Sequence, residues 1–284
     1  MAQDHGISWL NMPGYRPQTW NPTTGCSRMS PGCDNCYAKA MASRHRTMPS
    51  MAKTWPPERW WYDVRCHPER LDVPRRWKSP CMVFVDSMGD LFHTDVAAAF
   101  IDEVCLVIRG CPQHVFVALT KRPQSMREYC LVHHKAELPS NLWLGVSVES
   151  PAAKRRIDVL SGIPAAKRVV SFEPLLGDVG DLELLWHKSD AIELCSGGVQ
   201  HCHACPDRSC GDNMTKSRIA WVIAGCEKIG GRPGRPMDDT WVRSIRDQCA
   251  AADVPFFLKQ AVVDGHVVST PRLDGVRHVA WPEV

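Results

Sequence analysis

Short apolar runs recur along the chain at intervals that suit alternating strands and helices. Each run is only a few residues long and most are almost continuously apolar, which is typical of parallel strands covered on both faces. The runs are Met82–Asp86, Val115–Thr120, Leu142–Val148, Arg168–Phe172, Ala220–Ala224 and Pro255–Leu258. The sequence therefore predicts six parallel strands.

Helical patterns fill the intervals between these runs. Apolar residues return at every fourth position over Phe100–Ile108 and over Trp241–Cys249, and the second stretch follows two aspartates that suit an N-cap. Ser150 followed by Pro151 also predicts a helix start. This alternation favours an α/β fold, namely a parallel TIM-like barrel, partial at (β/α)6. A doubly wound sheet is the alternative, although no Gly-x-Gly-x-x-Gly follows an early strand.

Two segments interrupt the alternation. Residues 48–80 are rich in Pro, Trp and Arg, and residues 185–218 hold Gly, Cys, His and Asp with little periodicity. We therefore expect one domain over residues 1–284, with a Trp/Arg-rich lid at 48–80 and a Cys-rich metal-binding insertion at 185–218.

Composition narrows the possible classes of protein. The 284 residues are 44% hydrophobic and 23% charged, which excludes a disordered chain, a collagen and a coiled coil. No apolar run reaches the roughly 18 residues of a membrane helix, and the first residues do not form a secretory signal, so we expect no membrane partner. Lys and Arg exceed Asp and Glu by 34 − 31 = 3, too little to indicate nucleic-acid binding by itself.

Fourteen cysteines are present, and we expect no export signal. We therefore expect a reducing cytoplasm, where clustered thiols bind metal or do chemistry. Six cysteines lie in apolar or helical contexts and are expected to pack as small hydrophobic residues. They are Cys66, Cys81, Cys105, Cys111, Cys130 and Cys249.

Three cysteines carry the strongest chemical signal. Cys26, Cys33 and Cys36 are spaced C-x6-C-x2-C in a loop rich in Gly, Pro and Ser, just before a helical stretch. Thiolates suit zinc or iron–sulfur sites. A structural zinc site normally has four ligands, whereas a 4Fe–4S cluster held by three cysteines keeps one iron open. A zinc knuckle completed by His45 or Cys66 is the alternative.

The segment TWNPTTGCSRMSPGCDNCYA resembles the signature of a phage-type radical S-adenosylmethionine-like family, distantly similar to spore photoproduct lyase. Its first cysteine gap is three residues longer than the usual C-x3-C-x2-C. The resemblance continues through FVDSMGDLFH (84–93), LTKRP (119–123), LGVSVES (144–150), SFEPLLG (171–177), WVIAGCE (221–227), GRPM (234–237) and FFLKQ (256–260).

This resemblance implies a 4Fe–4S cluster that binds S-adenosylmethionine and generates a 5′-deoxyadenosyl radical, with flavodoxin or ferredoxin as reductant. It implies an isomerase that rearranges a nucleobase, a hypermodified thymine in phage DNA, in the host cytoplasm if the chain is phage-encoded. The alternatives are radical chemistry on a small molecule, a spore-photoproduct-type DNA lyase, and a non-enzymatic zinc-binding nucleic-acid module.

The resemblance also implies site residues at the carboxyl ends of the strands, where a parallel barrel carries its site. Ser87 and Asp90 occupy the place of the family's Gly-Gly-Glu motif, whose acid binds the methionine ammonium; an ordinary turn is the alternative. The other implied cofactor contacts are Tyr37, Thr120, Lys121, Ser147, Glu149, Glu173, Gly225 and Glu227. The candidate substrate contacts are Arg235, Lys259 and Gln260.

Two further patterns concern metal and nucleic acid. Four cysteines within 185–218 are enough to close a zinc site or to hold an auxiliary Fe–S cluster, with unligated thiols as the alternative. They are Cys195, Cys202, Cys205 and Cys210. Over Trp55–Trp77, aromatic residues that stack on bases alternate with arginines that pair with phosphate, which predicts a nucleic-acid-contacting lid. Tryptophans that merely cover the barrel are the alternative.

Overall fold

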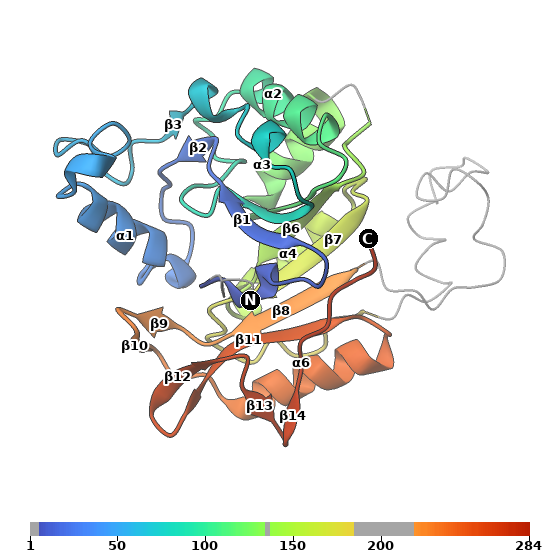
Figure 1. Ribbon diagram of the computed structural model, residues 1–284. Helices are drawn as coiled ribbons and strands as arrows, with labels where there is room; N and C mark the ends of the chain where they lie inside the picture. Colours follow the sequence, from blue (N-terminus) through green and yellow to red (C-terminus); the bar gives the residue numbers. More distant parts are fainter. Residues whose placement is uncertain (1–5, 134–136, 185–218) are drawn as a thin grey trace, which may run out of the picture.

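A curled, mostly parallel sheet of eight strands forms the centre of the computed structural model, which describes residues 6–133, 137–184 and 219–284 (Figure 1). Its order is β1-β4-β5-β6-β7-β8-β11-β12. Every neighbouring pair from β1 to β11 is parallel, and β12 runs antiparallel to β11. The strands are β1 (Arg16–Trp20), β4 (Cys81–Val85), β5 (Val115–Thr120), β6 (Leu142–Ser147), β7 (Lys167–Phe172), β8 (Trp221–Gly225), β11 (Phe256–Val263) and β12 (His266–Ser269).

The sheet confirms the predicted α/β class and all six predicted strands, which correspond to β4–β8 and β11. Two strands of this sheet, β1 and β12, were not predicted. β1 has the sequence RPQTW and β12 the sequence HVVS, so neither has the continuously apolar pattern of a central strand. Because β1 and β12 form opposite edges of the sheet, the structure is a half-barrel, and a TIM barrel is not confirmed.

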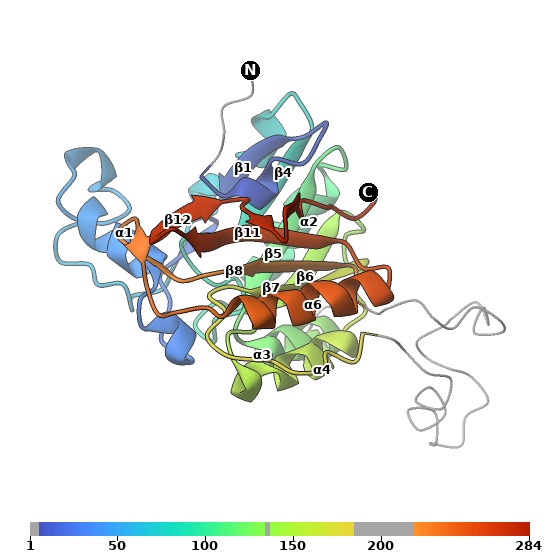
Figure 2. The same ribbon diagram turned by 90° about the horizontal axis from the view of Figure 1, so that it is seen from below.

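Among the described residues, four helices cover the convex face of the half-barrel, and a fifth, α1 (Tyr37–His45), lies apart from them (Figure 2). The four are α2 (Ala98–Arg109), α3 (Pro123–Glu128), α4 (Arg155–Ser161) and α6 (Asp239–Ala251). Helices α2 and α6 confirm the two periodic stretches. The predicted start at Ser150–Pro151 opens a 3-10 turn, Pro151–Ala153, that leads into α4.

The remaining elements are short. They are 3-10 helices Ser8–Leu10, Pro31–Cys33, Pro49–Met51, Pro68–Arg70, Pro74–Arg76 and Pro151–Ala153, the π-helix Tyr129–His133, and strands β2 (Thr23–Thr24), β3 (Arg65–Cys66), β9 (Lys228–Ile229), β10 (Arg232–Pro233), β13 (Arg272–Leu273) and β14 (Val276–Arg277). Within the described part of the chain, no helix is long and apolar enough to cross a membrane.

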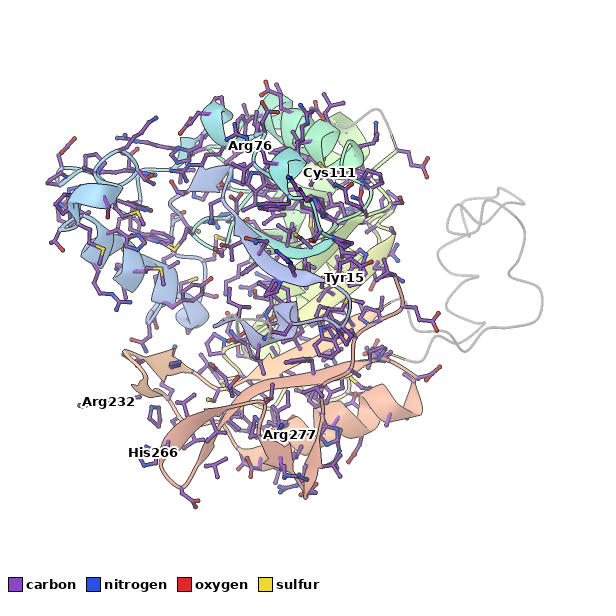
Figure 3. The ribbon with its side chains drawn as sticks, viewed as in Figure 1. Tyr15, Arg76, Cys111, Arg232, His266 and Arg277 are labelled. Atoms are coloured by element: carbon purple, nitrogen blue, oxygen red, sulfur yellow. The ribbon has the colours of Figure 1, made fainter. Side chains whose placement is uncertain are left out.

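Buried apolar side chains pack on both sides of the sheet. Between the convex face and the helices they include five of the six cysteines expected to pack as hydrophobic residues, and Cys111 is visible beside α2 (Figure 3). The sixth, Cys66, is half-buried. The packing interpretation is therefore confirmed for Cys81, Cys105, Cys111, Cys130 and Cys249.

Aromatic rings fill the concave side of the half-barrel near the amino ends of its strands. Trp9, on the 3-10 helix Ser8–Leu10, lies 5.8 Å between ring centroids from Trp221, which in turn lies 6.2 Å from Trp143. The Trp281 indole donates to the Trp9 carbonyl at 2.7 Å, so both chain ends close this region.

Gly145, in the middle of β6, illustrates how closely these strands pack. A Cβ atom there would lie 2.5 Å from the Val169 carbonyl oxygen and 2.6 Å from Leu119 Cδ2. We expect Gly145→Ala to lower the free energy of unfolding by about 1–3 kcal/mol, because backbone of β7 has to shift. Urea unfolding followed by circular dichroism measures this.

Gly162→Ala is the matched control for Gly145→Ala. Its new Cβ would meet only the Val159 carbonyl, at an ordinary 3.7 Å, so its unfolding midpoint stays near that of the wild type. Equal midpoints for the two variants would contradict the packing described for β6.

Candidate functional site

The three motif cysteines lie on the connection that leaves the carboxyl end of β1. We call residues 25–36 the cysteine loop. It contains the 3-10 helix Pro31–Cys33, and α1 begins directly after Cys36. Cys26, Cys33 and Cys36 are all free and half-buried, and the Cys36 amide donates to the Cys33 carbonyl at 3.3 Å.

The donor chemistry of the cysteine loop fits a soft metal site or an Fe–S cluster, since three unpaired thiols lie within eleven residues of one another. Across residues 6–133, 137–184 and 219–284, however, no three His, Cys, Asp or Glu side chains are grouped as a metal site. Binding a cluster therefore requires the three sulfurs to converge.

A second segment braces the start of the cysteine loop. Gly25 has φ +94°, and a Cβ there would lie 2.7 Å from the Asp63 carbonyl oxygen, so both conformation and space require glycine. The next amide, of Cys26, donates to the Trp61 carbonyl at 3.1 Å. Part of the predicted Trp/Arg-rich segment, at Trp61 and Asp63, therefore packs against the start of the cysteine loop.

Arg59 holds this bracing segment in place. Its buried guanidinium donates to the carbonyls of Thr24 at 2.9 Å and Thr54 at 2.6 Å, and it lies 4.1 Å from the Trp55 ring centroid. Burial lowers the pKa of this guanidinium to about 10. Arg59 and Trp55 are thus structural, which matches the alternative interpretation for part of the Trp/Arg-rich segment.

A buried guanidinium connects the cysteine loop to the ends of two strands. Arg122 Nη1 donates to Asp90 Oδ2 at 2.9 Å and to Cys26 Sγ at 3.3 Å, while Nη2 donates to the carbonyl of Ser27 at 2.9 Å and to its hydroxyl at 2.7 Å. The Thr120 hydroxyl donates to Asp90 at 2.8 Å. Asp90 and Thr120 therefore both hold the loop through Arg122.

His93 extends the same network in a defined tautomer. Its Nδ1 accepts from the Asp95 amide at 3.1 Å, so Nε2 carries the proton and donates to the Ser27 hydroxyl at 2.8 Å. Burial and the Arg122 guanidinium lower the pKa of this imidazole. Burial, aided by the Asp90 carboxylate, raises the pKa of the Cys26 thiol to about 11, and Arg122 opposes this rise.

The opposite side of the site joins the cysteine loop to the end of β8. Arg235 donates through its backbone amide and its Nε to Glu227 Oε2, both at 2.9 Å, and its Nη2 donates to the Pro31 carbonyl at 2.9 Å. Asn35 donates to the same Glu227 oxygen at 3.1 Å. These hydrogen bonds lower the pKa of Glu227. Glu227 thus joins Arg235 to Asn35 of the cysteine loop.

Glu149 follows β6 and lies against the cysteine loop. A Cβ at Gly32 would lie 3.0 Å from Glu149 Cγ, so the glycine beside Cys33 allows this contact. Glu149 Oε2 accepts from Arg156 at 2.8 Å, and Arg156 also donates to the Ser147 carbonyl at 2.6 Å. Glu149 Oε1 is buried and accepts no hydrogen bond from the described residues. A buried, unpaired carboxylate oxygen is costly, so this oxygen is available to a hydrogen-bond donor, either a water molecule or a ligand.

The strand ends beyond Glu149 bring four more predicted residues together. Lys259 forms an ion pair with Glu173, and both are largely but not fully buried. The Gln260 amide donates to the Cys226 carbonyl at 2.8 Å, and a Cβ at Gly225 would lie 3.2 Å from Gln260 Cγ. This ion pair places one positive and one negative group at the same end of the half-barrel.

Tyr37 and Ser87, two of the predicted cofactor contacts, form hydrogen bonds with other residues of the chain. The Tyr37 hydroxyl donates to the Ser87 carbonyl at 2.6 Å, and the Ser87 hydroxyl donates to Asn21 at 3.2 Å. Lys121 is half-buried beside Arg122. Of the two cations that follow the strand ending at Thr120, Lys121 was the one assigned to the site, whereas Arg122 is the one that contacts the cysteine loop.

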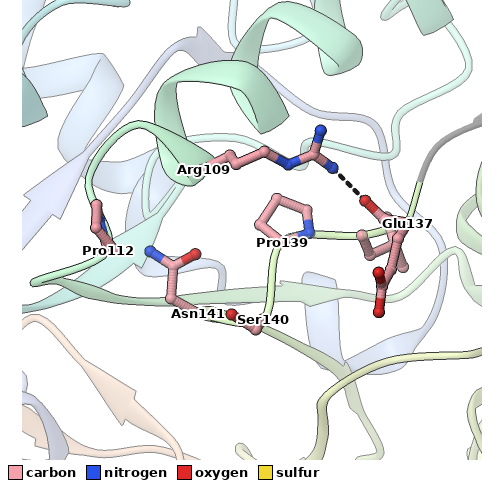
Figure 4. A pocket seen from close by; sticks show the side chains of 7 residues that line it. Arg109, Pro112, Glu137, Pro139, Ser140 and Asn141 are labelled. Carbon is pink, nitrogen blue, oxygen red and sulfur yellow. Dashed lines mark hydrogen bonds between the residues drawn. The ribbon is translucent and has the colours of Figure 1, made fainter.

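A surface hollow of about 360 Å³ lies at the other end of the strands (Figure 4). It is bordered by Arg109, Glu137 and Asn141, which lie near the amino ends of β5 and β6. The chemistry-bearing residues are not there. The second cysteine group, Cys195, Cys202, Cys205 and Cys210, lies outside the described residues.

Asp86 fixes the path from β1 toward the cysteine loop. Its carboxylate accepts from the Thr23 amide at 2.8 Å and the Thr23 hydroxyl at 2.7 Å. Burial raises the pKa of this carboxyl from near 3.8 to about 8; the Thr23 hydrogen bonds oppose the rise, Asp90 adds to it, and Arg70 opposes it.

The raised pKa predicts a pH dependence of stability. Between about pH 4 and about pH 8 the folded chain binds more protons at Asp86 than the unfolded chain, so this contribution to the free energy of unfolding falls as pH rises. Asp86→Asn removes that fall, whereas Asp158→Asn, at an exposed position on α4, retains it. Urea titrations at several pH values measure this; identical slopes in the two variants would contradict it.

Comparison with known proteins adds a family. A family model described as "Protein of unknown function (DUF5131)" matches residues 6–273, which include the cysteine loop and every strand of the large sheet. No curated protein and no solved structure matches the chain. Since the match covers most of its length, this chain belongs to the DUF5131 family.

Proposed function

We propose that this chain is a radical S-adenosylmethionine enzyme that modifies a nucleobase. In this proposal Cys26, Cys33 and Cys36 hold a 4Fe–4S cluster. The observation that carries it is the position of three free thiols on one loop at the carboxyl ends of parallel strands, where an α/β enzyme holds its ligands. When bound, the cluster supplies one electron and an open iron to S-adenosylmethionine.

The chain's own residues provide groups for a polar ligand beside that loop. Glu149 Oε1 is positioned to accept a hydrogen bond from a ligand hydroxyl or ammonium group, because the oxygen is buried and the described residues do not satisfy it. Lys259 and Glu173 offer one charge of each sign nearby. The buried aromatic rings on the concave side form an apolar cluster near the amino ends of the strands.

We assign Asp90 a different role from the one implied by the resemblance. Its carboxylate already accepts from Thr120 and Arg122, and its side chain is only 6% exposed. An ammonium group would have to displace a guanidinium to reach it. We therefore assign the ligand ammonium or hydroxyl to Glu149, and we assign Asp90 to positioning the cysteine loop.

Two exposed aromatic residues next to Arg59 and Trp61 support a nucleobase substrate. Trp60 and Tyr62 are 66% and 52% exposed, an unusual situation for large aromatic residues. Arg46 lies 4.6 Å from the Trp60 ring centroid and Lys39 lies 5.2 Å from that of Tyr62. Aromatic faces with adjacent cations bind unpaired bases and their phosphates. Isomerisation of a modified thymine in DNA is the reaction we favour, with lyase-type repair as the second candidate.

Removing any one thiol of the loop tests the cluster. After anaerobic reconstitution, we expect each of Cys26→Ala, Cys33→Ala and Cys36→Ala to lose the absorbance at about 400 nm that arises from Fe–S charge transfer. Each variant is also expected to form no 5′-deoxyadenosine. Cys66→Ala, which removes another half-buried free thiol, is the control that retains both. Colourless wild-type protein with one zinc ion on the three thiols would contradict the proposal.

Truncating the exposed aromatics tests the substrate class. Trp60→Ala and Tyr62→Ala are each expected to weaken binding of a fluorescent thymine-rich single strand about tenfold, since stacking contributes roughly 1–3 kcal/mol per base. Leu106→Ala, at an exposed apolar position on α2, is the control. Fluorescence anisotropy at fixed salt measures the affinities, and unchanged binding in both aromatic variants would remove the support for a nucleic-acid substrate.

A further inference from the structure

The ion pair between Arg122 and Asp90 lies directly against Cys26. Both side chains are almost fully buried, at 5% and 6% exposure, and their charged atoms are 2.9 Å apart. The same guanidinium nitrogen that contacts Asp90 also donates to Cys26 Sγ at 3.3 Å. One charged group thus touches both a buried counter-charge and a thiol.

The geometry around Arg122 leaves its guanidinium little freedom. Its second nitrogen donates twice to Ser27, and Ser27 also receives a hydrogen bond from the neutral His93 ring. Because a guanidinium is a rigid planar fork, these contacts fix the N–H group that faces the sulfur. A lysine would supply the charge without this fork.

A purely structural role does not explain why charged residues are here. Burying an ion pair costs desolvation energy, and apolar residues of similar volume often stabilise such a site as well or better. From β5, Arg122 contacts this end of the loop, and from the turn after β4, Asp90 contacts Arg122. Their consequence is an electric field at the Cys26 sulfur.

Resting on the function proposed above, we propose that the Arg122–Asp90 pair sets the reduction potential of the cluster that Cys26 helps to hold. Reduction takes one electron from a low-potential donor, adds one negative charge to the cluster, and neither forms nor breaks a bond. The N–H donor and positive charge of Arg122 favour that added charge, whereas the carboxylate of Asp90 opposes it. Arg122 and Asp90 are thus positioning and tuning residues.

Two single variants separate this role from mere support. Arg122→Met removes the donor and the positive charge, so the midpoint potential is expected to become more negative. Asp90→Asn removes the negative charge while keeping a hydrogen-bond acceptor, so the potential is expected to become less negative. The double variant returns toward the wild-type value. If the pair were merely structural, the midpoint potentials of both single variants would shift in the same direction, or neither potential would shift.

The measurement is a dithionite titration with redox mediators, followed by electron paramagnetic resonance of the reduced reconstituted protein. Arg168→Met is the matched control, because it removes another half-buried arginine, at the amino end of β7, and leaves the potential unchanged. If Arg122→Met does not fold, Arg122→Lys replaces it, with a smaller negative shift expected from loss of the fork.

The outcomes distinguish failure of this inference from failure of the proposed function. A cluster whose potential is unmoved, or moves with the same sign, in the Asp90 and Arg122 variants overturns this inference and leaves the proposed function standing. If the Arg122 variants do not fold, a potential in Asp90→Asn that is unchanged or more negative overturns it alone. A wild-type protein that holds no cluster overturns both, and that result is visible before any variant is made.

Discussion

The buried guanidinium of Arg122 is the contact on which the arrangement of the site depends. It joins the end of β5, the turn after β4 and the first cysteine of the loop after β1 through hydrogen bonds to Asp90, Ser27 and Cys26. These segments are far apart in the sequence, so the contact forms only when the parallel strands are in place. The fold therefore supplies the position of the thiol, and the thiol loop in turn covers a buried charge.

The half-barrel divides its concave side into two chemically different parts. Near the amino ends of the strands, aromatic rings such as Trp9 and Trp221 pack edge to face and exclude water. Near the carboxyl ends, Glu149, Glu173 and Lys259 bring charge beside the cysteine loop. A low-dielectric floor beneath charged groups strengthens the interactions of a bound ligand with them.

The sequence predicts the central strands well because a strand covered on both faces must be apolar at nearly every position, as VFVALT in β5 is. It misses β1, since an edge strand tolerates polar residues and proline such as Arg16, Pro17 and Gln18. Lone acids at strand ends, such as Glu173, are identifiable from their apolar surroundings. Arg122 is not, because its role depends on a hydrogen bond to Cys26, 96 positions away.

The central proposal is that Cys26, Cys33 and Cys36 hold a 4Fe–4S cluster with one open iron. Mössbauer spectroscopy of protein reconstituted with isotopically enriched iron tests this most directly, when spectra with and without S-adenosylmethionine are compared. The account predicts that the signal of a single iron site changes when the sulfonium compound is added, while the others stay the same. Iron that does not enter the loop, or a spectrum that is insensitive to the compound, would contradict it.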